Sequence, residues 1–211
     1  MSDSTSATPG LRDRLTQAIN QGARRVPTWV LYIVGAVPPI WLFIAGLTGG
    51  LGVDPVKAME HQMGEWALWL LIAGLCITPL RRFAGINLLR FRRAIGLLAF
   101  FYIVGHLLVW LVLDVQILSQ IWRDILKRPY ITIGMAAFVL LIPLAVTSNN
   151  LSIRKMGARW PQLHKLVYLA AVLGAVHFVM LVKGFQYEPL IYLGVVLALL
   201  ALRLPILSRR R

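Results

Sequence analysis

The sequence predicts an all-α membrane protein with six transmembrane helices packed as a bundle. The chain of 211 residues is 58% hydrophobic, with a mean hydropathy of +0.72, well above the usage of ordinary globular domains. A membrane span needs about 20 predominantly apolar residues, and six runs with little or no charge approach that length. Soluble core helices would require polar faces, which these runs almost entirely lack. The runs cover residues 28–48, 64–80, 94–113, 130–148, 162–182 and 189–207.

Proline residues punctuate these runs in chain order. Pro38 and Pro39 lie inside the first run and should kink it. The second run ends near Pro79 and is expected to extend backward toward His61. The third run contains neither proline nor charge. Proline is tolerated at the first helical position, and the last three runs each open near one, at Pro129, Pro161 and Pro189.

Basic residues are distributed unevenly between the connecting segments. With a cytoplasmic N-terminus, 17 of the 22 Lys and Arg residues fall on the inner side, and 6 of the 8 acidic residues fall on the outer side. The excess of basic residues in cytoplasmic segments therefore predicts that both termini are cytoplasmic. The net charge of +14 is then explained by topology and by contact with anionic membrane lipid. Nucleic acid is not an expected partner, because the basic residues do not form one continuous face.

We divide the chain into three parts. Residues 1–27 are a polar, basic cytoplasmic tail, residues 28–207 the six-helix transmembrane domain, and residues 208–211 a basic C-terminal tail. Within the first tail, residues 11–25 fit either an amphipathic helix on the inner membrane surface or a disordered segment. The tail lacks the apolar core of a cleaved signal peptide. Since no phosphate-binding glycine motif occurs and the loops are short, neither a nucleotide-binding domain nor a separate catalytic domain is expected.

Three of the four histidines lie inside apolar runs. Histidine is costly within a membrane, so each is a functional candidate, and imidazole is a common axial ligand of haem iron. Counted at about 1.5 Å per residue from the inner ends of their runs, His106 and His177 reach similar depths in the outer half of the membrane. They are therefore candidate metal ligands on one haem. Hydrogen bonding between helices and proton relay are the alternative roles.

His164 lies near the inner edge of the run that also holds His177. The two are 13 residues apart, so in a regular helix their side chains point more than about 100° apart. Either the helix is locally overwound, or the two histidines bind haem on different sides of it, and His164 is predicted to serve a second, inner site. Arg92 stands 14 residues before His106, where a second pair of histidines would need its fourth member. Arg92 and Arg93 fit either positive-inside arginines or partners of haem propionates, and Arg92 has a further interpretation as a weak or indirect axial position.

The fourth histidine, His61, falls at the outer start of the second run, a position more typical of an interface residue than of a ligand. Six segments occur in a fixed order around these histidines. They are LGVDPVKAMEHQMGEWALWLL, ITPLRRF, RRAIGLLAFFYIVGHLL, RPYITIG, LAVTSN and RWPQLHKLVYLAAVLGAVHF. This ordered set, across residues 28–205, resembles the MsrQ family, also called YedZ. That family is the haem-binding membrane subunit of a periplasmic methionine sulfoxide reductase system and belongs to a wider ferric-reductase-like transmembrane group.

The resemblance implies a function and a cofactor set. It implies b-type haem, one or two per chain, with the family's haem ligands mapping onto His106, His164 and His177, and it associates FMN with the chain. It further implies electron transfer across a bacterial inner membrane, from the quinone pool or a cytosolic flavin reductase. The acceptor would be a periplasmic molybdopterin subunit, MsrP, which reduces methionine sulfoxide in oxidised proteins. The chain would then be a non-catalytic electron-transfer subunit. The alternatives are a ferric reductase or oxidase acting directly at the outer haem, and a proton channel or transporter.

Overall fold

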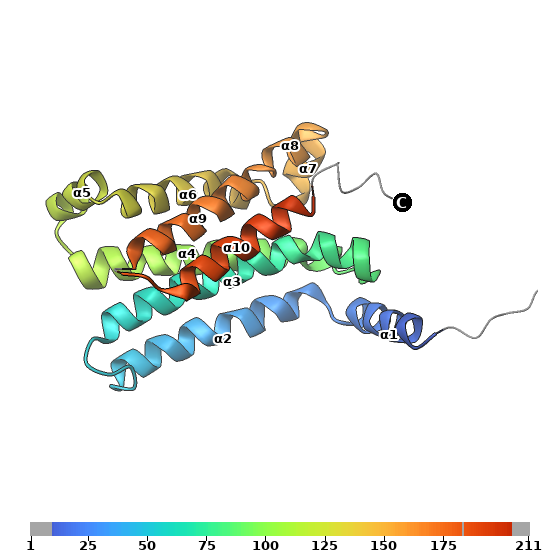
Figure 1. The fold of residues 1–211 in the computed structure, drawn as a ribbon, viewed down its shortest axis with the longest axis horizontal. Helices are drawn as coiled ribbons and strands as arrows, with labels where there is room; N and C mark the ends of the chain where they lie inside the picture. The colour runs from blue at the N-terminus through green and yellow to red at the C-terminus, as the bar shows by residue number, and fades with distance from the viewer. Residues whose placement is uncertain (1–9, 183, 204–211) are drawn as a thin grey trace, which may run out of the picture.

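The computed structural model describes residues 10–182 and 184–203, and all regular secondary structure within them is helical (Figure 1). Most of the elements are α-helices, whereas η1 is a 3₁₀ helix and η2 a π-helix. In chain order they are α1 (Leu11–Arg25), α2 (Thr28–Leu47), α3 (Pro55–Ala84), η1 (Leu89–Phe91), α4 (Arg92–Leu108), η2 (Val109–Val115), α5 (Leu118–Lys127), α6 (Pro129–Val146), α7 (Asn150–Met156), α8 (Arg159–Leu163), α9 (Leu166–Leu181) and α10 (Tyr187–Ala201).

Five stretches are long and apolar enough to cross a membrane: Thr28–Leu47, Pro55–Ala84, Leu89–Val115, Pro129–Val146 and Arg159–Leu181. The prediction of an all-α protein with several membrane spans is therefore confirmed. The sixth predicted span corresponds to α10, whose 15 residues reach about 22 Å at 1.5 Å per residue. The last residues of that run and the predicted tail at 208–211 lie outside the described residues. Six spans, and the side on which the termini lie, stay predictions.

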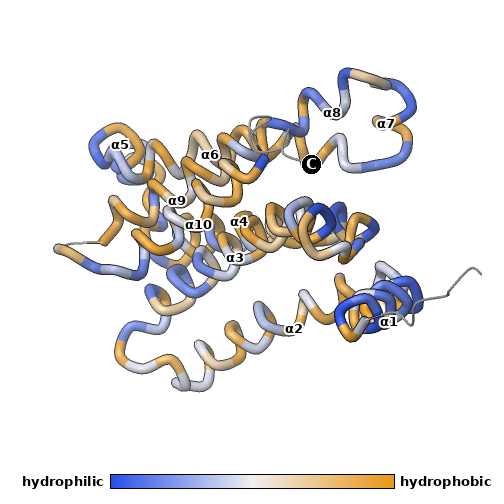
Figure 2. The backbone as a smooth tube through the Cα atoms, turned by 45° about the vertical axis from the view of Figure 1, so that its right-hand side comes forward, coloured by the Kyte–Doolittle hydropathy of each residue, from blue (hydrophilic) through white to orange (hydrophobic). Residues whose placement is uncertain are grey.

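The long helices place their connections at two ends of the molecule (Figure 1). One end, here called the α5 end, carries α5 together with the α2–α3 and α9–α10 connections. The other, here called the α7 end, carries α1, α7, α8 and the last described residues. Hydrophilic residues gather toward these ends, at α1, α5 and α7, whereas the helices between them are mostly hydrophobic (Figure 2).

The helix interfaces are built around small residues. Ala99 on α4 and Ala170, Ala171 and Ala175 on α9 are completely buried. Small side chains allow helix backbones to approach closely, which is how helices associate where lipid weakens the hydrophobic drive. In the structure, α3 packs against α4, and α6 packs against α9. These two helix pairs form the walls of the cavities described below.

Helix α3, which contains the second predicted run, begins earlier than that run. Its N-cap is Asp54, whose side chain accepts a hydrogen bond from the backbone N–H of Lys57 at 3.2 Å, and Pro55 occupies the first helical position. The hydrogen bond from Lys57 lowers the pKa of Asp54. An acidic N-cap followed by proline is a strong start signal, so α3 gains more than two turns at the α5 end.

Helix α1 is attached to the connection between α3 and η1. The Asn20 side chain donates to the Gly85 carbonyl at 3.0 Å and accepts from the Asn87 backbone N–H at 2.7 Å. Arg12 donates to the Phe83 carbonyl at 2.8 Å. Residues 11–25, for which the sequence allows either a helix or a disordered segment, therefore form a helix in the structure.

Replacing Asn20 with alanine should release α1 from this connection. Both hydrogen bonds of the side chain would be lost, at about 1 kcal/mol each, so cleavage within residues 11–25 under limited proteolysis should become faster by roughly 10-fold or more. Gln17→Ala, an exposed position on the same helix, is the matched control. Equal cleavage rates for the Asn20 variant and the wild-type protein would show that α1 is held by other contacts.

Candidate functional site

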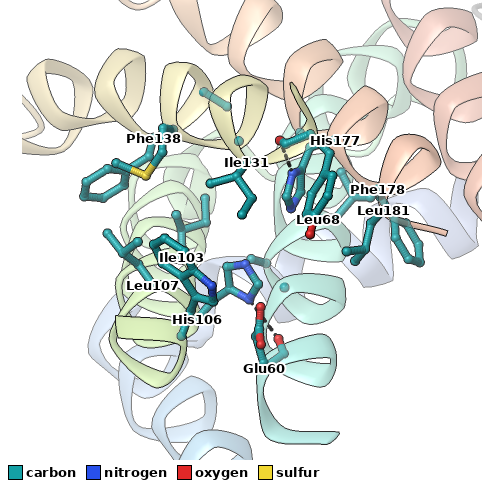
Figure 3. Close-up of a pocket in the computed structure, with 18 of the residues that line it drawn as sticks. Glu60, Leu68, Ile103, His106, Leu107, Ile131, Phe138, His177, Phe178 and Leu181 are labelled. Atoms are coloured by element: carbon teal, nitrogen blue, oxygen red, sulfur yellow. Dashed lines mark hydrogen bonds between the residues drawn. The ribbon is translucent and has the colours of Figure 1, made fainter. Parts of the chain in front are cut away.

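A cavity of about 250 Å³ lies between α3, α4, α6 and α9, toward the α5 end. Its walls are mostly apolar and include Leu68, Ile103 and Phe138. His106 from α4 and His177 from α9 face each other across it (Figure 3). The structure thus brings into one cavity the two histidines that the sequence predicts to lie at a similar depth.

The two imidazoles are spaced as axial ligands of one metal would be. Their ring centroids are 6.3 Å apart, and their planes cross at 76°. Two metal–nitrogen bonds of about 2 Å each, with each ring centre about 1 Å beyond its nitrogen, require a separation of about 6 Å. Nowhere in the described residues, this cavity included, does a group of three or more His, Cys, Asp or Glu side chains form a site for a bare metal ion. The donor set of the cavity therefore fits a haem iron between two histidines.

The outer nitrogen of each ring is held by a backbone carbonyl. His106 Nδ1 lies 2.8 Å from the Glu60 carbonyl oxygen, and His177 Nδ1 lies 2.7 Å from the Tyr130 carbonyl oxygen. A carbonyl can only accept, so each Nδ1 carries the proton and each Nε2 keeps its lone pair. Such a hydrogen bond fixes the tautomer of a metal-binding histidine and raises its basicity as a ligand.

Ionisable residues lie around the mouth of this cavity at the α5 end. Among its lining residues are Lys57, Glu60, His61, Asp114 and Arg128. Arg128 donates to the Tyr130 hydroxyl at 3.2 Å and forms an ion pair with Asp124 at 3.3 Å. The hydrogen bond with Tyr130 raises the pKa of Arg128. Its charged guanidinium therefore lies at the start of α6, next to the Tyr130 carbonyl that holds His177.

A second cavity, of about 740 Å³, lies toward the α7 end. It collects Arg92, Arg93 and His164, which the sequence assigns to an inner site, together with Lys165. Arg93 donates to the Asn150 side chain at 2.8 Å. The two cavities share Leu71 and Leu141 as wall residues. Phe138 of the first cavity also stacks on Phe100 of the second, with ring centroids 5.9 Å apart.

His164 differs from the other two histidines in its local structure. The angle expected between His164 and His177 assumes one continuous helix. In the structure α8 ends at Leu163 and α9 begins at Leu166, so the His164 ring projects from a turn. It stacks on Trp160, with centroids 3.9 Å apart, and its Nε2 lies 3.0 Å from the Thr147 hydroxyl oxygen. That hydroxyl donates to the Pro143 carbonyl at 2.6 Å, so it accepts from Nε2–H. The nitrogen that carries the lone pair on His164 is therefore Nδ1.

Known proteins resemble this chain in sequence. A family model described as "Ferric reductase like transmembrane component" matches residues 63–175, from α3 into α9. The heme-binding subunit MsrQ of protein-methionine-sulfoxide reductase from Brucella anthropi is 55% identical over 177 residues, covering 83% of this chain and 80% of that protein. The subunit of the same name from Brucella ovis is 55% identical over 186 residues, covering 87% and 84% respectively. The chain belongs to the MsrQ family. The resemblance seen in the sequence is thus confirmed, and no solved structure matches the chain.

In this member of the MsrQ family, two candidate cofactor contacts escape sequence reasoning. Lys57 and Arg128 line the mouth of the first cavity, where cations can bind the carboxylates of a haem. From the sequence they count only as basic residues of outer segments. The available signal is the order Arg128-Pro129-Tyr130, which places a cation directly before the helix start whose carbonyl holds His177.

Proposed function

We propose that this chain is a membrane electron-transfer subunit that binds b-type haem between His106 and His177. The observation that carries the proposal is the 6.3 Å separation of two imidazoles whose Nδ1 atoms are both held by carbonyls. The names of the relatives, heme-binding subunits of protein-methionine-sulfoxide reductase, support it. Haem iron, when bound, supplies one-electron redox chemistry whose potential depends on ligands, hydrogen bonds and burial.

The chain's own residues set the environment of that iron. His106 and His177 present Nε2 lone pairs, and the carbonyls of Glu60 and Tyr130 keep both rings in one tautomer. The apolar walls exclude water, which strengthens every electrostatic interaction inside. Lys57 and Arg128 at the mouth are placed to bind the carboxylates of the cofactor.

We assign the second cavity to a second b-type haem, next to His164 and flanked by Arg92 and Arg93. Such an arrangement would place one haem toward each end of the bundle, separated by the shared wall of Leu71 and Leu141. The cationic character of this cavity suits an anionic cofactor. FMN, which the family resemblance also implies, has no assigned residues in this proposal.

The distribution of charge supports an orientation of the chain in the membrane, and the family resemblance supplies the direction of electron flow. Basic side chains gather at the α7 end, in α1, η1, α7 and α8, which favours a cytoplasmic location for that end. Electrons would enter there from the quinone pool or a cytosolic flavin reductase. They would leave at the α5 end, on the periplasmic side of a bacterial inner membrane, to a molybdopterin subunit of the MsrP type that reduces methionine sulfoxide.

The experiment that tests this proposal follows haem oxidation in the purified chain. The protein should show a b-type haem spectrum, and the reduced haem should be reoxidised anaerobically on adding the purified MsrP-type subunit with methionine sulfoxide. Omitting the sulfoxide is the control. Absence of haem would overturn the binding proposal, and failure to reoxidise with both partners present would overturn the electron-transfer proposal.

One observation favours a second candidate function, direct reduction of a metal or oxygen at the outer haem. The matching family model is that of a ferric reductase-like component. Rapid reoxidation by a ferric chelate or oxygen without any protein partner, faster than with the MsrP-type subunit, would favour this alternative.

A further inference from the structure

Each ring of the His106–His177 pair packs against a glycine. A Cβ built on Gly64 would lie 3.1 Å from His106 Nδ1, and one built on Gly134 would lie 2.8 Å from His177 Nδ1. At 2.8 Å something must shift, and at 3.1 Å the neighbour must give way. Neither glycine has a positive φ. The backbone conformation therefore does not require glycine at these positions, whereas the approach of the imidazole does.

The glycines stand in the same relation to the two hydrogen-bonding carbonyls. Gly64 follows Glu60 by four residues, and Gly134 follows Tyr130 by four. In an α-helix the N–H of residue i+4 donates to the carbonyl of residue i, and the side chain at i+4 leans back over that turn. A carbonyl oxygen has two lone pairs, so the imidazole can share it with the helix. A side chain at i+4 would occupy the path by which the ring reaches it.

This arrangement occurs twice with nearly the same spacing. The separation between carbonyl and histidine is 46 residues in the first half and 47 in the second. Both α3 and α6 begin with proline at the α5 end, and both α4 and α9 return toward that end with the histidine (Figure 1). Two helix pairs of the same design therefore face each other across one cavity.

We propose that Gly64 and Gly134 are positioning residues that admit the rings of His106 and His177 to the carbonyls of Glu60 and Tyr130. They thereby hold Nδ1–H on the backbone and direct Nε2 into the cavity. The proposal rests on the proposed function in one respect, that the metal between the rings is haem iron. It assigns a role in ligand geometry to two residues that would otherwise count as helix packing.

Alanine at either position should weaken haem binding without removing a ligand. The added methyl group pushes the ring from its carbonyl, and losing such an outer hydrogen bond typically costs about 10- to 100-fold in metal affinity. Gly134→Ala should have the larger effect, because its Cβ lies closer to the ring. Without the hydrogen bond from Nδ1–H, the imidazole donates less electron density to the iron. The haem reduction potential should therefore rise.

The test compares Gly64→Ala and Gly134→Ala with Gly194→Ala on α10, where a Cβ meets no atom within 4 Å. We would measure haem per chain, the rate of haem transfer to an apoprotein acceptor, the midpoint potential and the low-spin EPR signal. The first two variants should transfer haem at least about 10-fold faster, and the control should match the wild type. If both glycine variants keep the haem content, transfer rate and midpoint potential of the wild-type protein, the inference is overturned. If the wild-type protein itself binds no haem, the proposed function is overturned instead.

A second measurement avoids dependence on the folding of the alanine variants. In a His177→Gly protein supplied with haem, added imidazole should restore the low-spin spectrum, because its free N–H can reach the Tyr130 carbonyl. 4-Methylimidazole, which keeps that N–H, should also restore it. 1-Methylimidazole cannot donate and carries its methyl group where Gly134 leaves space only for a proton, so it should bind about 10-fold more weakly or worse. Equal restoration by all three would contradict the role of the carbonyl and the glycine.

Discussion

Replacing His106 or His177 with alanine should abolish the low-spin b-type haem spectrum of the purified protein. Under the proposed assignment, each variant would remove one of the two imidazoles that hold the iron and leave the other as its only protein ligand. The effect should exceed the roughly 10- to 100-fold loss typical of outer-sphere changes, so that haem in the first cavity is lost during purification. Optical spectra with haem quantified per chain would measure it.

His61→Ala is the matched control for this prediction. His61 also lines the first cavity but is exposed at its mouth, so its variant should keep the haem spectrum. The wild-type protein offers a further check. Because the imidazole planes cross at 76°, the ferric protein should show the strongly anisotropic low-spin EPR signal of crossed axial imidazoles. Normal haem content in a protein lacking both His106 and His177 would contradict the assignment.

The pairing of His106 with His177 is available from the sequence because depth in a membrane can be counted. Each lies in an apolar run with a basic inner boundary, and a regular rise along the helix brings both to a similar level. The partners of their Nδ1 atoms are not available in this way. Any residue type supplies a backbone carbonyl, so nothing in the identity of Glu60 or Tyr130 marks that role. Gly64 and Gly134 become informative only once α3–α4 and α6–α9 are known to pack in pairs.

The second cavity shows a different limit of sequence reasoning. The sequence groups Arg92, Arg93 and His164 correctly at one end of the bundle, because all three lie near the inner boundaries of their runs. It does not anticipate the break between α8 and α9, since His164 and Lys165 at the break stand at the polar start of the run and do not mark a turn by themselves. Local hydrogen bonds and the Trp160 ring decide where His164 points, and neither changes the hydropathy of the segment.

Replacing His164 with alanine should remove the second haem and leave the haem between His106 and His177 in place. His164 is the only histidine lining the second cavity among the described residues, so its loss leaves no imidazole there. The remaining spectrum should be that of the first haem alone, with its midpoint potential little changed. Haem quantification and a redox titration of the variant beside the wild-type protein would resolve the two contributions.

Thr147→Val is the variant that separates ligation from packing at this site. Valine removes the hydroxyl that accepts from His164 Nε2 at 3.0 Å, while nearly preserving the shape of the side chain. If the imidazole serves as a ligand through Nε2, its proton must move to Nδ1 and its bond to Thr147 must open when haem binds, so Thr147→Val should retain the second haem at wild-type occupancy or tighter. If it serves through Nδ1, Thr147→Val removes an outer hydrogen bond and should weaken haem binding by about 10-fold without removing the ligand. If His164 only supports Thr147 and Trp160, both variants should leave haem content unchanged and lower thermal stability, by about 1 kcal/mol for one hydrogen bond. Loss of the second haem in His164→Ala together with its retention in Thr147→Val would therefore mark His164 as a ligand, because only the imidazole distinguishes the two proteins at the iron.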